Sequence, residues 1–360
     1  MRFPNFEGEW KVKKLGEVCE IKTGNKDTQN KVENGKYPFF VRSNTVEKID
    51  SYSYDGEAIL TSGDGVGVGK NFHYINGKFD FHQRVYALRN FRNGYSGKYI
   101  YHLFSEKFYD RVRKLSAKNS VDSVRMDMIS EMKVYFPLLL EQQKISSFLS
   151  LIDERIQTQN KIINDLKTLK TATAKKIFSG ELRFKDDNGN DFSEWEDKKL
   201  GDISIKKSSN ISANTLEENQ GNFKIYGANG LLKEIDFYRE EKPYIAIVKD
   251  GAGVGRLLLC EGKSSVLGTL DIIKNKEQTD LLFLYYLLET IDFTKFTTGS
   301  TIPHIYFKDY SKEIIGLPSF PEQTKIANFL SSIDSKSDIE NQLLQKLEAQ
   351  KKYLLQNIFV

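Results

Sequence analysis

The sequence is poor in the residues that build metal sites and disulfide frameworks. It has 2 cysteines, Cys19 and Cys260, and 4 histidines, and none of them shows the CxxC or HxxxH spacing of metal ligands. A zinc site and a disulfide scaffold are therefore both disfavoured, and a reducing cytoplasmic location is expected. No run of 18 apolar residues occurs, and no signal-peptide pattern follows Met1. We therefore expect neither secretion nor a membrane span.

Motifs of catalytic chemistry are missing as well. The chain has no GxSxG, no HExxH and no tetrapeptide of the Asn-Pro-Pro-Tyr type that an adenine methyltransferase uses. The Gly69-Lys70 pair fails the nucleotide P-loop pattern, because Asp64 stands where a glycine is needed and Asn71 where Ser or Thr is needed. We therefore expect a non-catalytic protein that binds no metal or cofactor of its own.

What the sequence does contain, it contains twice. The segment that begins at Glu141 recurs from Glu322, an offset of 181 residues, and a proline precedes each copy. The only two tryptophans, Trp10 and Trp195, stand in similar openings 185 residues apart. Self-similarity at a fixed period is the mark of a duplicated structural unit. The chain is therefore interpreted as a tandem repeat in which each unit is a globular region followed by a helical segment.

Each helical segment carries apolar residues in alternating steps of four and three, which is typical of a long helix with a coiled-coil seam. Residues 141–178 would reach about 57 Å as a helix. Chain connectivity favours antiparallel packing, because parallel packing would require the second globular region to span the whole helix length. The predicted seam residues are Ile145, Leu149, Ile152, Ile156, Ile163 and Leu166 in the first copy, and Ile326, Leu330, Ile333, Leu344, Leu347 and Leu354 in the second.

Three polar residues interrupt this predicted seam, namely Gln159, Ser337 and Glu340. A polar seam residue often fixes the register of a coiled coil at a cost in stability. The alternative is that these residues face solvent where the helices splay apart. The sequence leaves both interpretations open.

The globular regions are predicted to mix helices and strands. Buried strands are expected at 58–61 and 244–248, and short core helices at 99–104 and 281–288. We predict an α+β fold in which two mixed α/β regions are separated by two long helices, packed as an antiparallel coiled coil with an internal pseudo-two-fold repeat. The predicted boundaries are a first globular domain at 1–140, a first helix at 141–180, a second globular domain at 181–321 and a second helix at 322–360.

The two globular regions differ in charge. Residues 1–140 carry 23 basic and 17 acidic residues, a net charge of +6, whereas residues 185–321 carry 17 basic and 22 acidic residues, a net charge of −5. The first region could meet a polyanion without help. The second could do so only through a local basic patch, so charge alone does not predict a nucleic-acid-binding protein.

Each globular region contains a glycine-rich loop, Asp64–Lys70 in the first and Asp250–Arg256 in the second. The spacing loosely resembles a dinucleotide-binding loop, which should open a helix, but the residues after both loops look like strands. Two interpretations stay open. The loops are tight structural turns, or their backbones approach an anionic ligand closely.

Polar side chains that can hydrogen-bond base edges gather in loops at matching places of the two regions. Taken singly, each is more often an ordinary turn or cap residue. Together they indicate two surfaces with different side chains on matched frames. The candidates are Arg42, Ser43, Asn44, Gly65, Gly67, Lys70, Gln83, Arg84 and Arg125 in the first region, and Tyr226, Asn229, Lys249, Gly253, Arg256 and His304 in the second.

This arrangement resembles the specificity (S) subunit of type I restriction–modification systems. The resemblance is carried by the openings at Trp10 and Trp195, the two glycine loops, and segments 137–153 and 318–334, which look like the family's Pro–Glu–Gln signature and share the run Glu–Gln–x–x–Ile–x–x–Phe–Leu–x–x–Ile–Asp. It covers essentially the whole chain. One departure is that Asp122-Ser123 stands where the second unit has Pro303-His304.

The resemblance implies a function for each part. The globular regions would be target recognition domains, each reading one half of a split double-stranded DNA sequence. The paired helices would space them and bind two modification (methyltransferase) subunits, which bring S-adenosylmethionine. Restriction subunits, which use ATP and Mg, are expected as further partners.

Two other functions stay open from the sequence. The first is a non-enzymatic adaptor whose coiled coil spaces two protein-binding heads. The second is a lone methyltransferase, which the missing motifs disfavour. Enrichment of a gapped consensus from random duplexes would distinguish DNA recognition from the adaptor.

Overall fold

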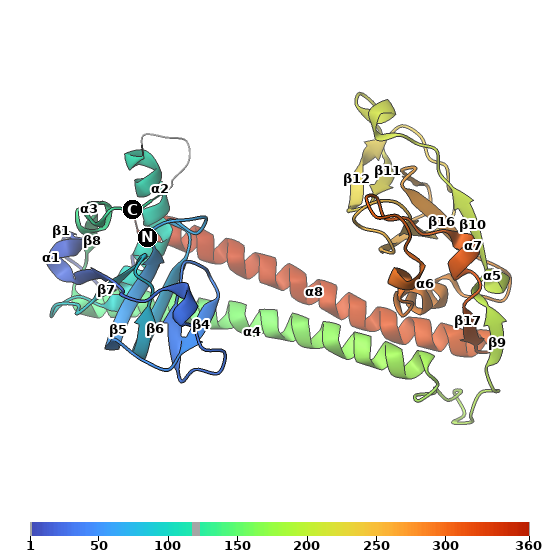
Figure 1. Ribbon diagram of the computed structural model, residues 1–360, viewed down its shortest axis with the longest axis horizontal. Helices are drawn as coiled ribbons and strands as arrows, with labels where there is room; N and C mark the ends of the chain where they lie inside the picture. Colours follow the sequence, from blue (N-terminus) through green and yellow to red (C-terminus); the bar gives the residue numbers. More distant parts are fainter. Residues whose placement is uncertain (1, 117–122, 360) are drawn as a thin grey trace. The chain divides into compact units, whose positions relative to one another are not determined.

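The computed structural model describes residues 2–116 and 123–359 and divides the chain into two compact units (Figure 1). Unit 1 comprises residues 1–160 and 342–360, and unit 2 comprises residues 161–341. The division falls inside two long helices, α4 (Leu139–Phe178) and α8 (Phe320–Ile358), so each unit has one globular region and a part of both helices. Within the described ranges, no helix is both long and apolar enough to cross a membrane.

Unit 1 is built on a six-stranded sheet of order β2-β7-β5-β6-β3-β4. All neighbours are antiparallel except β3 and β6. The strands are β2 (Glu20–Thr23), β3 (Tyr37–Phe40), β4 (Val46–Ile49), β5 (Tyr54–Ser62), β6 (Phe72–Phe81) and β7 (Val85–Arg89). A separate ladder joins β1 (Lys11–Lys14) to β8 (Lys133–Phe136), and the helical elements are α1 (Leu15–Val18), η1 (Thr28–Asn30), α2 (Gly97–Leu115) and α3 (Met126–Ser130).

Helix α2 forms because its sequence offers both a start signal and one apolar face. The Ser96 side chain accepts a hydrogen bond from the Tyr99 amide, which satisfies a free donor of the first turn. Buried residues recur along the helix at three- and four-residue steps, from Tyr99 to Val112. Arg113 and Lys114 lie in the last turn, where the negative end of the helix dipole stabilises their positive charges. The helix therefore packs one face into the core that the beginning of α4 and the end of α8 share.

Unit 2 repeats this frame with a shorter central hairpin and a shorter core helix. Its four-stranded sheet has the order β10-β16-β13-β14, and a three-stranded sheet has the order β12-β11-β15. The strands are β10 (Ser204–Ser208), β11 (Phe223–Gly227), β12 (Gly230–Ile235), β13 (Tyr244–Val248), β14 (Leu257–Cys260), β15 (Ser265–Val266) and β16 (Leu270–Asn275). Strand β9 (Glu196–Lys199) pairs with β17 (Ile314–Leu317), and the helical elements are α5 (Leu200–Ile203), η2 (Ala213–Leu216), α6 (Leu281–Glu289), η3 (Phe293–Phe296) and α7 (Phe307–Tyr310).

The two sheets correspond strand by strand. The order β2-β7-β5-β6 in unit 1 matches β10-β16-β13-β14 in unit 2. The long strand β6 pairs with β5 along most of its length and with β3 at Asp80 and Phe81. In unit 2 these two roles fall to separate strands, because β14 pairs with β13 and β15 pairs with β11. One strand of unit 1 is therefore broken into two in unit 2.

The predicted elements are present, with one difference in length. Strand β5 contains the expected strand at 58–61, β13 coincides with 244–248, and α6 contains 281–288. The short helix expected at 99–104 is the beginning of α2, which continues to Leu115. The predicted helix ended at residue 104 because charged residues of the exposed face follow there, and they interrupt the apolar run on which the prediction was based. The mixed α/β character of two repeated regions is confirmed.

The long helices contribute apolar residues to the core of each unit. In unit 1, Ile145 and Leu149 near the beginning of α4 share a core with Leu354 and Ile358 near the end of α8. In unit 2, Ile177 near the end of α4 shares a core with Ile326, Leu330 and other residues near the beginning of α8. Of the remaining predicted seam residues, Ile152, Ile163, Ile333 and Leu347 are buried, and Ile156, Leu166 and Leu344 are half-buried.

The polar seam residues are not fully exposed. Gln159 is only 6% exposed, and Ser337 and Glu340 are half-buried. A further polar contact lies beside the seam in each unit. Lys351 Nζ lies 2.5 Å from Asp153 Oδ1 in unit 1, and Lys170 Nζ lies 2.9 Å from Asp334 Oδ2 in unit 2. These residues are equivalent under the 181-residue repeat, so the same ion pair forms twice with the helices exchanged.

A buried Glu-Gln pair fastens the beginning of each long helix to its globular region. Gln142 Nε2 donates to the carbonyl oxygens of Gly94 and Pro137 at 3.0 and 2.9 Å, and its Oε1 accepts from the Ser96 amide at 3.0 Å. Gln323 makes the same three contacts in unit 2, with the carbonyls of Gln278 and Pro318 and the amide of Asp280. The glutamine thus holds the turn that precedes α2 or α6. We call this arrangement the glutamine clasp.

The neighbouring glutamate holds the chain segment that enters each globular region. Glu141 accepts two hydrogen bonds from Arg2, both at 2.8 Å. Glu322 accepts two from Arg183 at 2.9 and 3.0 Å and a third from Trp195 Nε1 at 3.0 Å. The Pro–Glu–Gln signature is therefore a structural joint, a role that the sequence analysis did not assign to it.

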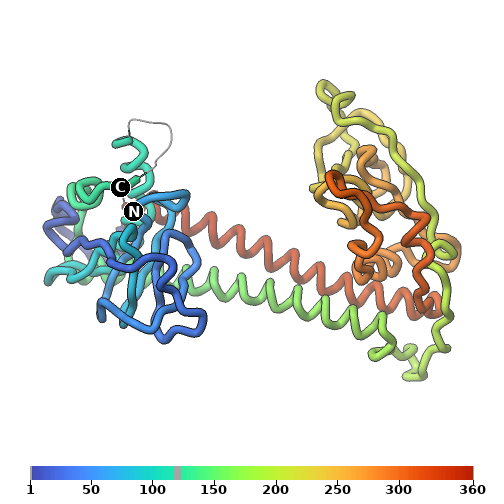
Figure 2. Tube along the Cα trace, viewed as in Figure 1, coloured from blue at the N-terminus to red at the C-terminus, as the bar shows by residue number. Residues whose placement is uncertain are grey.

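The last helical turn of α8 lies in unit 1, beside the N-terminal segment (Figure 2). The Phe359 ring packs on Tyr99 with a centroid distance of 5.4 Å, and Tyr99 also meets the Trp10 ring at 6.5 Å. The end of the chain thus completes the core of the first globular region.

Candidate nucleic-acid interface

Three loops and a strand connection converge at one end of the sheet in unit 1. The glycine loop joins β5 to β6, and the Gly63 amide donates to the Arg84 carbonyl at 2.7 Å. The Gly63 carbonyl accepts from the Val124 amide at 2.7 Å, which places the segment before α3 against the same loop. We call residues 42–45, 63–71, 82–84 and 123–125 the first loop cluster. Residues 120–122 of the segment before α3 lie outside the described residues.

The glycine loop lies in the connection of residues 63–71 between the antiparallel strands β5 and β6. Gly65 and Gly69 have φ angles of +82° and +65°, which favour glycine. A Cβ on Gly67 would lie 1.9 Å from Nδ2 of Asn71, so no other residue fits that position without displacing Asn71. The loop leads into the predicted strand and not into a helix, which excludes a dinucleotide-binding geometry.

Two of the predicted arginines meet at a single carboxylate in this cluster. Arg42 Nη1 lies 3.0 Å from Asp64 Oδ1, and Arg84 Nη1 lies 3.3 Å from Asp64 Oδ2. Both arginine side chains are exposed, at 44% and 64%, whereas that of Asp64 is 21% exposed. The pKa of the neighbouring His82 imidazole is lowered by burial and by the charge of Arg42, which favours its neutral form.

The other predicted residues of the first cluster have local partners. The amino group of Lys70 lies 5.3 Å from the centre of the Tyr109 ring, the amide of Gln83 donates to Asp27, and Arg125 pairs with Asp127. Ser43 Oγ donates to the Thr45 carbonyl, Asn44 is exposed, and Gly65 and Gly67 belong to the glycine loop. The structure therefore brings Arg42 and Arg84 together and places the remaining candidates around them.

The same loops converge in unit 2. The Gly251 amide donates to the Pro303 carbonyl at 2.9 Å, and the Ile305 amide donates to the Lys249 carbonyl at 3.0 Å. The second glycine loop is thereby held against the segment before α7, as the first is held against the segment before α3. We call residues 226–230, 249–256 and 301–308 the second loop cluster.

The side chains of the second cluster differ from those of the first. His304 Nδ1 lies 2.7 Å from Asp250 Oδ1, and Arg256 Nη1 donates at 2.8 Å both to Asn229 Oδ1 and to the Ala228 carbonyl. Four predicted residues, Asn229, Lys249, Arg256 and His304, are thus linked to the second glycine loop, which contains Gly253. Tyr226 is half-buried against the core, and this burial raises the pKa of its hydroxyl.

A basic hollow of about 610 Å³ opens beside the second glycine loop. Its floor includes Asp271, only 5% exposed, which accepts from Ser208 Oγ at 2.8 Å and from Lys249 Nζ at 3.2 Å. Three residues of its lining, Lys206, Tyr306 and Lys308, were missed by the sequence analysis. Tyr306 and Lys308 follow the predicted His304 closely, but Lys206 comes from β10 and gave no signal. With three lysines and two aspartates in its lining, this hollow has a small excess of positive charge within the otherwise acidic second region.

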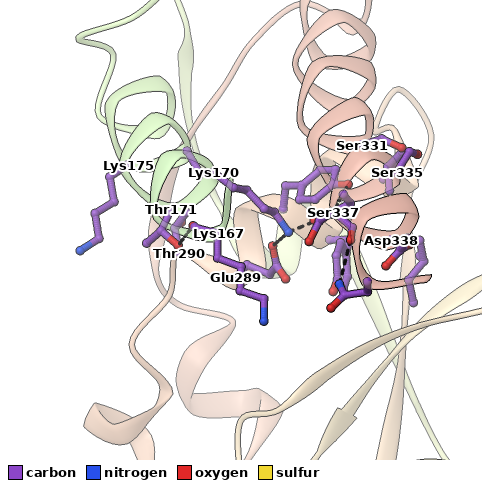
Figure 3. A pocket seen from close by; sticks show the side chains of 17 residues that line it. Lys167, Lys170, Thr171, Lys175, Glu289, Thr290, Ser331, Ser335, Ser337 and Asp338 are labelled. Atoms are coloured by element: carbon purple, nitrogen blue, oxygen red, sulfur yellow. Dashed lines mark hydrogen bonds and ion pairs between the residues drawn. The ribbon is translucent and has the colours of Figure 1, made fainter. Parts of the chain in front are cut away.

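A second hollow, of about 920 Å³, lies between α4, α6 and α8 within unit 2 (Figure 3). Lys170 points into it and contacts Glu289 Oε2 and Asp334 Oδ2, both at 2.9 Å. Burial opposes protonation of Lys170, but its hydrogen bonds to the two carboxylates outweigh this and raise its pKa. Tyr286 Oη also donates to Asp334 at 2.8 Å. The hollow is thus lined by ion pairs that join the two long helices to α6.

The two thiols are not placed for chemistry. Cys19 and Cys260 are 5% and 1% exposed, and burial raises the pKa of each to about 12. A thiol with such a pKa is protonated at neutral pH and is a poor nucleophile. In the part of the chain that the structure describes, no three His, Cys, Asp or Glu side chains are grouped so that they could hold a metal ion.

Comparisons with known proteins agree with this arrangement. Residues 7–168 and 192–349 each match the family model described as "Type I restriction modification DNA specificity domain". The chain is 23% identical to the type I restriction enzyme EcoDI specificity subunit of Escherichia coli, over 93% of this chain and 84% of that relative. It is 26% identical to the putative type I restriction enzyme MjaX specificity subunit of Methanocaldococcus jannaschii, over 96% of this chain and 82% of that relative.

Solved structures show the same fold. The S subunit of a type I restriction–modification system from M. genitalium superposes with a TM-score of 0.70 at 19% identity, covering 99% of this chain and 97% of that one. A chain from a structural study of complex assembly and conformational transition in a type I system superposes with a TM-score of 0.58 at 14% identity, covering 99% and 98% of the two chains. With two matches to the family model and the resemblance in its motifs, this chain belongs to the type I restriction–modification specificity subunits, which recognise DNA sequence and are not themselves catalytic.

Proposed function

We propose that the chain reads a split DNA target, one half with each loop cluster. The observation that carries the proposal is that the same loops converge in both units but present different side chains. A repeated frame with unlike contacts is what two unlike half-sites require. Arg42, Arg84, Arg256, Asn229 and His304 are the proposed base-reading residues, because their side chains offer the donors and acceptors that base edges match.

The remaining cations are assigned to the DNA backbone. Lys70 and Arg125 would contact phosphates in the first half-site, and Lys249, Lys206 and Lys308 in the second. Phosphate contacts fix the orientation of a protein on the duplex and carry no sequence information of their own. The basic hollow supports this assignment, because it brings three lysines together in an otherwise acidic region, where each could meet a phosphate.

The long helices are proposed to form an antiparallel coiled coil that spaces the two recognition domains. Support comes from each unit separately, since the beginning of one helix packs with the end of the other in both cores. The repeated Lys–Asp ion pair supports the same register. The domain boundaries at 140, 180 and 321 follow from this proposal and place each recognition domain before its helix.

Two modification subunits are proposed to dock on these helices and to supply S-adenosylmethionine for adenine methylation. Support comes from large apolar side chains that remain exposed on the helices, including Leu151 at 56%, Leu169 at 55% and Ile339 at 64%. Restriction subunits with ATP and Mg would join the same complex. The assembly would act on DNA in the cytoplasm.

The DNA proposal is tested by selection from a random duplex pool, using the chain together with its modification subunit. We expect enrichment of a consensus with two defined parts and an undefined gap. Enrichment of one continuous motif would contradict the split target. No enrichment at all would favour an adaptor that spaces two protein-binding heads.

The docking proposal is tested with Leu151→Asp and Ile339→Asp, which place a charge on the exposed helix surface. We expect each variant to lose co-purification with the modification subunit while its circular dichroism spectrum stays unchanged. Leu231→Asp is the matched control, because Leu231 is similarly exposed, at 55%, but lies on β12. Normal co-purification of both helix variants would contradict docking at these positions.

A further inference from the structure

The centre of the first loop cluster holds an acidic residue, Asp64, although the negative charge of DNA would repel it. Asp64 is the first residue of the glycine loop, two residues after β5 ends at Ser62, and its two carboxylate oxygens each contact a different arginine, at 3.0 and 3.3 Å. The backbone beside Asp64 is held in place, since the amide and carbonyl of the preceding residue, Gly63, bond to Arg84 and Val124. Asp64 therefore holds both arginines at one carboxylate, an arrangement that we call the two-arginine mount.

The contacts leave most of each guanidinium available. Each arginine uses one Nη1 group on Asp64, and the described residues give neither guanidinium another acceptor. A guanidinium has five N–H donors, and two of them form the bidentate contact with O6 and N7 of guanine. An arginine whose conformation is already fixed loses less freedom on binding than a mobile one. The two guanidinium groups therefore keep the N–H donors that base readout needs, in addition to their positive charge.

The second cluster has no such pair. The equivalent carboxylate, Asp250, contacts His304, and Arg256 is held by the uncharged oxygens of Asn229 and Ala228. The two-arginine mount is therefore a property of the first recognition region alone, and its effect should be confined to one half-site.

We propose that Asp64 is a positioning residue that presents Arg42 and Arg84 together to guanine bases in the major groove of the first half-site. This inference rests on the proposed function. Asp64 contacts no base itself. Its negative charge also repels phosphates, so it weakens binding to unrelated sequences while it strengthens binding to the correct one. The first half-site accordingly contains guanines whose replacement costs more than replacement of their neighbours.

The test uses Asp64→Asn in the full chain with its modification subunit. Asparagine keeps the shape of the side chain but removes the charge that holds both arginines. We expect roughly tenfold or greater loss of discrimination at the guanines of the first half-site, with the second half-site profile unchanged. Binding to unrelated duplex should stay equal or become tighter. An unchanged base profile in this variant would overturn the proposal.

Three controls separate positioning from other effects. Asp55→Asn makes the same change of charge at the other end of β5, where Asp55 is exposed, and should leave both profiles unchanged. Asp250→Asn should alter only the second half-site. Asp64→Glu keeps the charge and should restore part of the discrimination. Loss of discrimination in Asp55→Asn equal to that in Asp64→Asn would show a general effect of charge and would overturn the proposal.

A combined variant guards against misfolding of Asp64→Asn. Arg42→Lys with Arg84→Lys keeps both charges but removes the bidentate donors. If Asp64 acts through the arginines, adding Asp64→Asn to this background changes the base profile no further. A further change there would overturn the proposal. Absence of any gapped consensus for the unmodified chain would instead reject the proposed function, which keeps the two failures distinct.

Discussion

The two globular regions show which parts of a recognition domain are fixed and which are free. Their sheets share one strand order and the same loop contacts, yet β6 of the first is divided into β14 and β15 in the second. Their net charges are +6 and −5, and their clusters hold an arginine pair in one case and a histidine with a single arginine in the other. The buried frame is constrained by packing, whereas the loops at its edge are constrained only by their ligand.

A buried position beside the long helices shows the same contrast. His102 in unit 1 lies near Asp153, which pairs with Lys351. In unit 2 the corresponding place is taken by Tyr286, which donates to Asp334. The two residues fill equivalent sites, but only the histidine can take up a proton when the pH falls below neutral. The halves should therefore respond differently to acid.

The largest expected effect tests whether the glutamine clasp is equally important in both units. Gln142→Ala and Gln323→Ala each leave one buried carbonyl and two part-buried backbone groups without their partner, which should lower the free energy of unfolding by about 3 kcal/mol. Denaturant unfolding measures the loss, and amide exchange locates it at the beginning of α2 or α6. Gln143→Ala is the control, because Gln143 is exposed. Loss of stability in only one of the two variants would show that the clasp is not equally important in the two units.

The next prediction is that the stability of the two units depends differently on pH. Burial lowers the pKa of His102 to about 4, partly offset by Asp153, so the folded state keeps this imidazole neutral. The resulting stability is complete above the unfolded pKa of about 6.5 and is lost as the pH falls toward 4. The loss for unit 1 should reach about 2 kcal/mol at pH 5.

Amide exchange as a function of pH measures this difference region by region. Helix α2 should lose protection below pH 6.5, and α6 should not. His102→Gln should remove the dependence in unit 1, and Tyr286→His should introduce it in unit 2. Equal loss of protection in α2 and α6 would show that His102 is not its source.

A smaller effect separates the two half-sites. Arg84→Ala should weaken binding at the first half-site and Arg256→Ala at the second, each by roughly 1–2 kcal/mol. Affinities for duplexes mutated in one half at a time report which half each residue reads. Equal loss on every sequence would mean that these arginines contact phosphates.

The smallest effect concerns the basic hollow of the second region. Lys308→Ala removes one cation from its lining and should reduce the slope of log affinity against log salt by about one, without changing base preference. Glu313→Ala, at a half-buried position three residues beyond α7, is the control and should leave the slope unchanged. An altered base profile for Lys308→Ala would assign this lysine to base readout.

The parts of the fold that repeat a simple period were predictable. Apolar residues at steps of three and four predicted α4 and α8, and short apolar runs predicted β5 and β13. The loops that would meet could also be named, because they recur at matching places. The partners of Gln142 could not be predicted, since they are backbone atoms of a turn 46 and 48 residues away. A contact to the backbone leaves no trace in the side-chain pattern.

The sequence predicted which loops would form the candidate site better than it predicted the contacts of individual side chains. Arg42, Arg84, Asn229, Arg256 and His304 lie together with the glycine loops as the repeat implied. The role of Asp64 was missed because an acidic residue is an unfavourable contact for DNA when it is considered alone. Lys206 was missed because its place in the hollow depends on the pairing of β10 with β16, which brings it near Asp271.

The glutamine clasp has a consequence for how such a protein can change over generations. Its acceptors and donors are main-chain atoms, which every amino acid possesses. The reading loops can therefore accumulate substitutions freely without loosening the attachment of the domain to its helix. A lineage could acquire new target preferences while inheriting an unaltered scaffold.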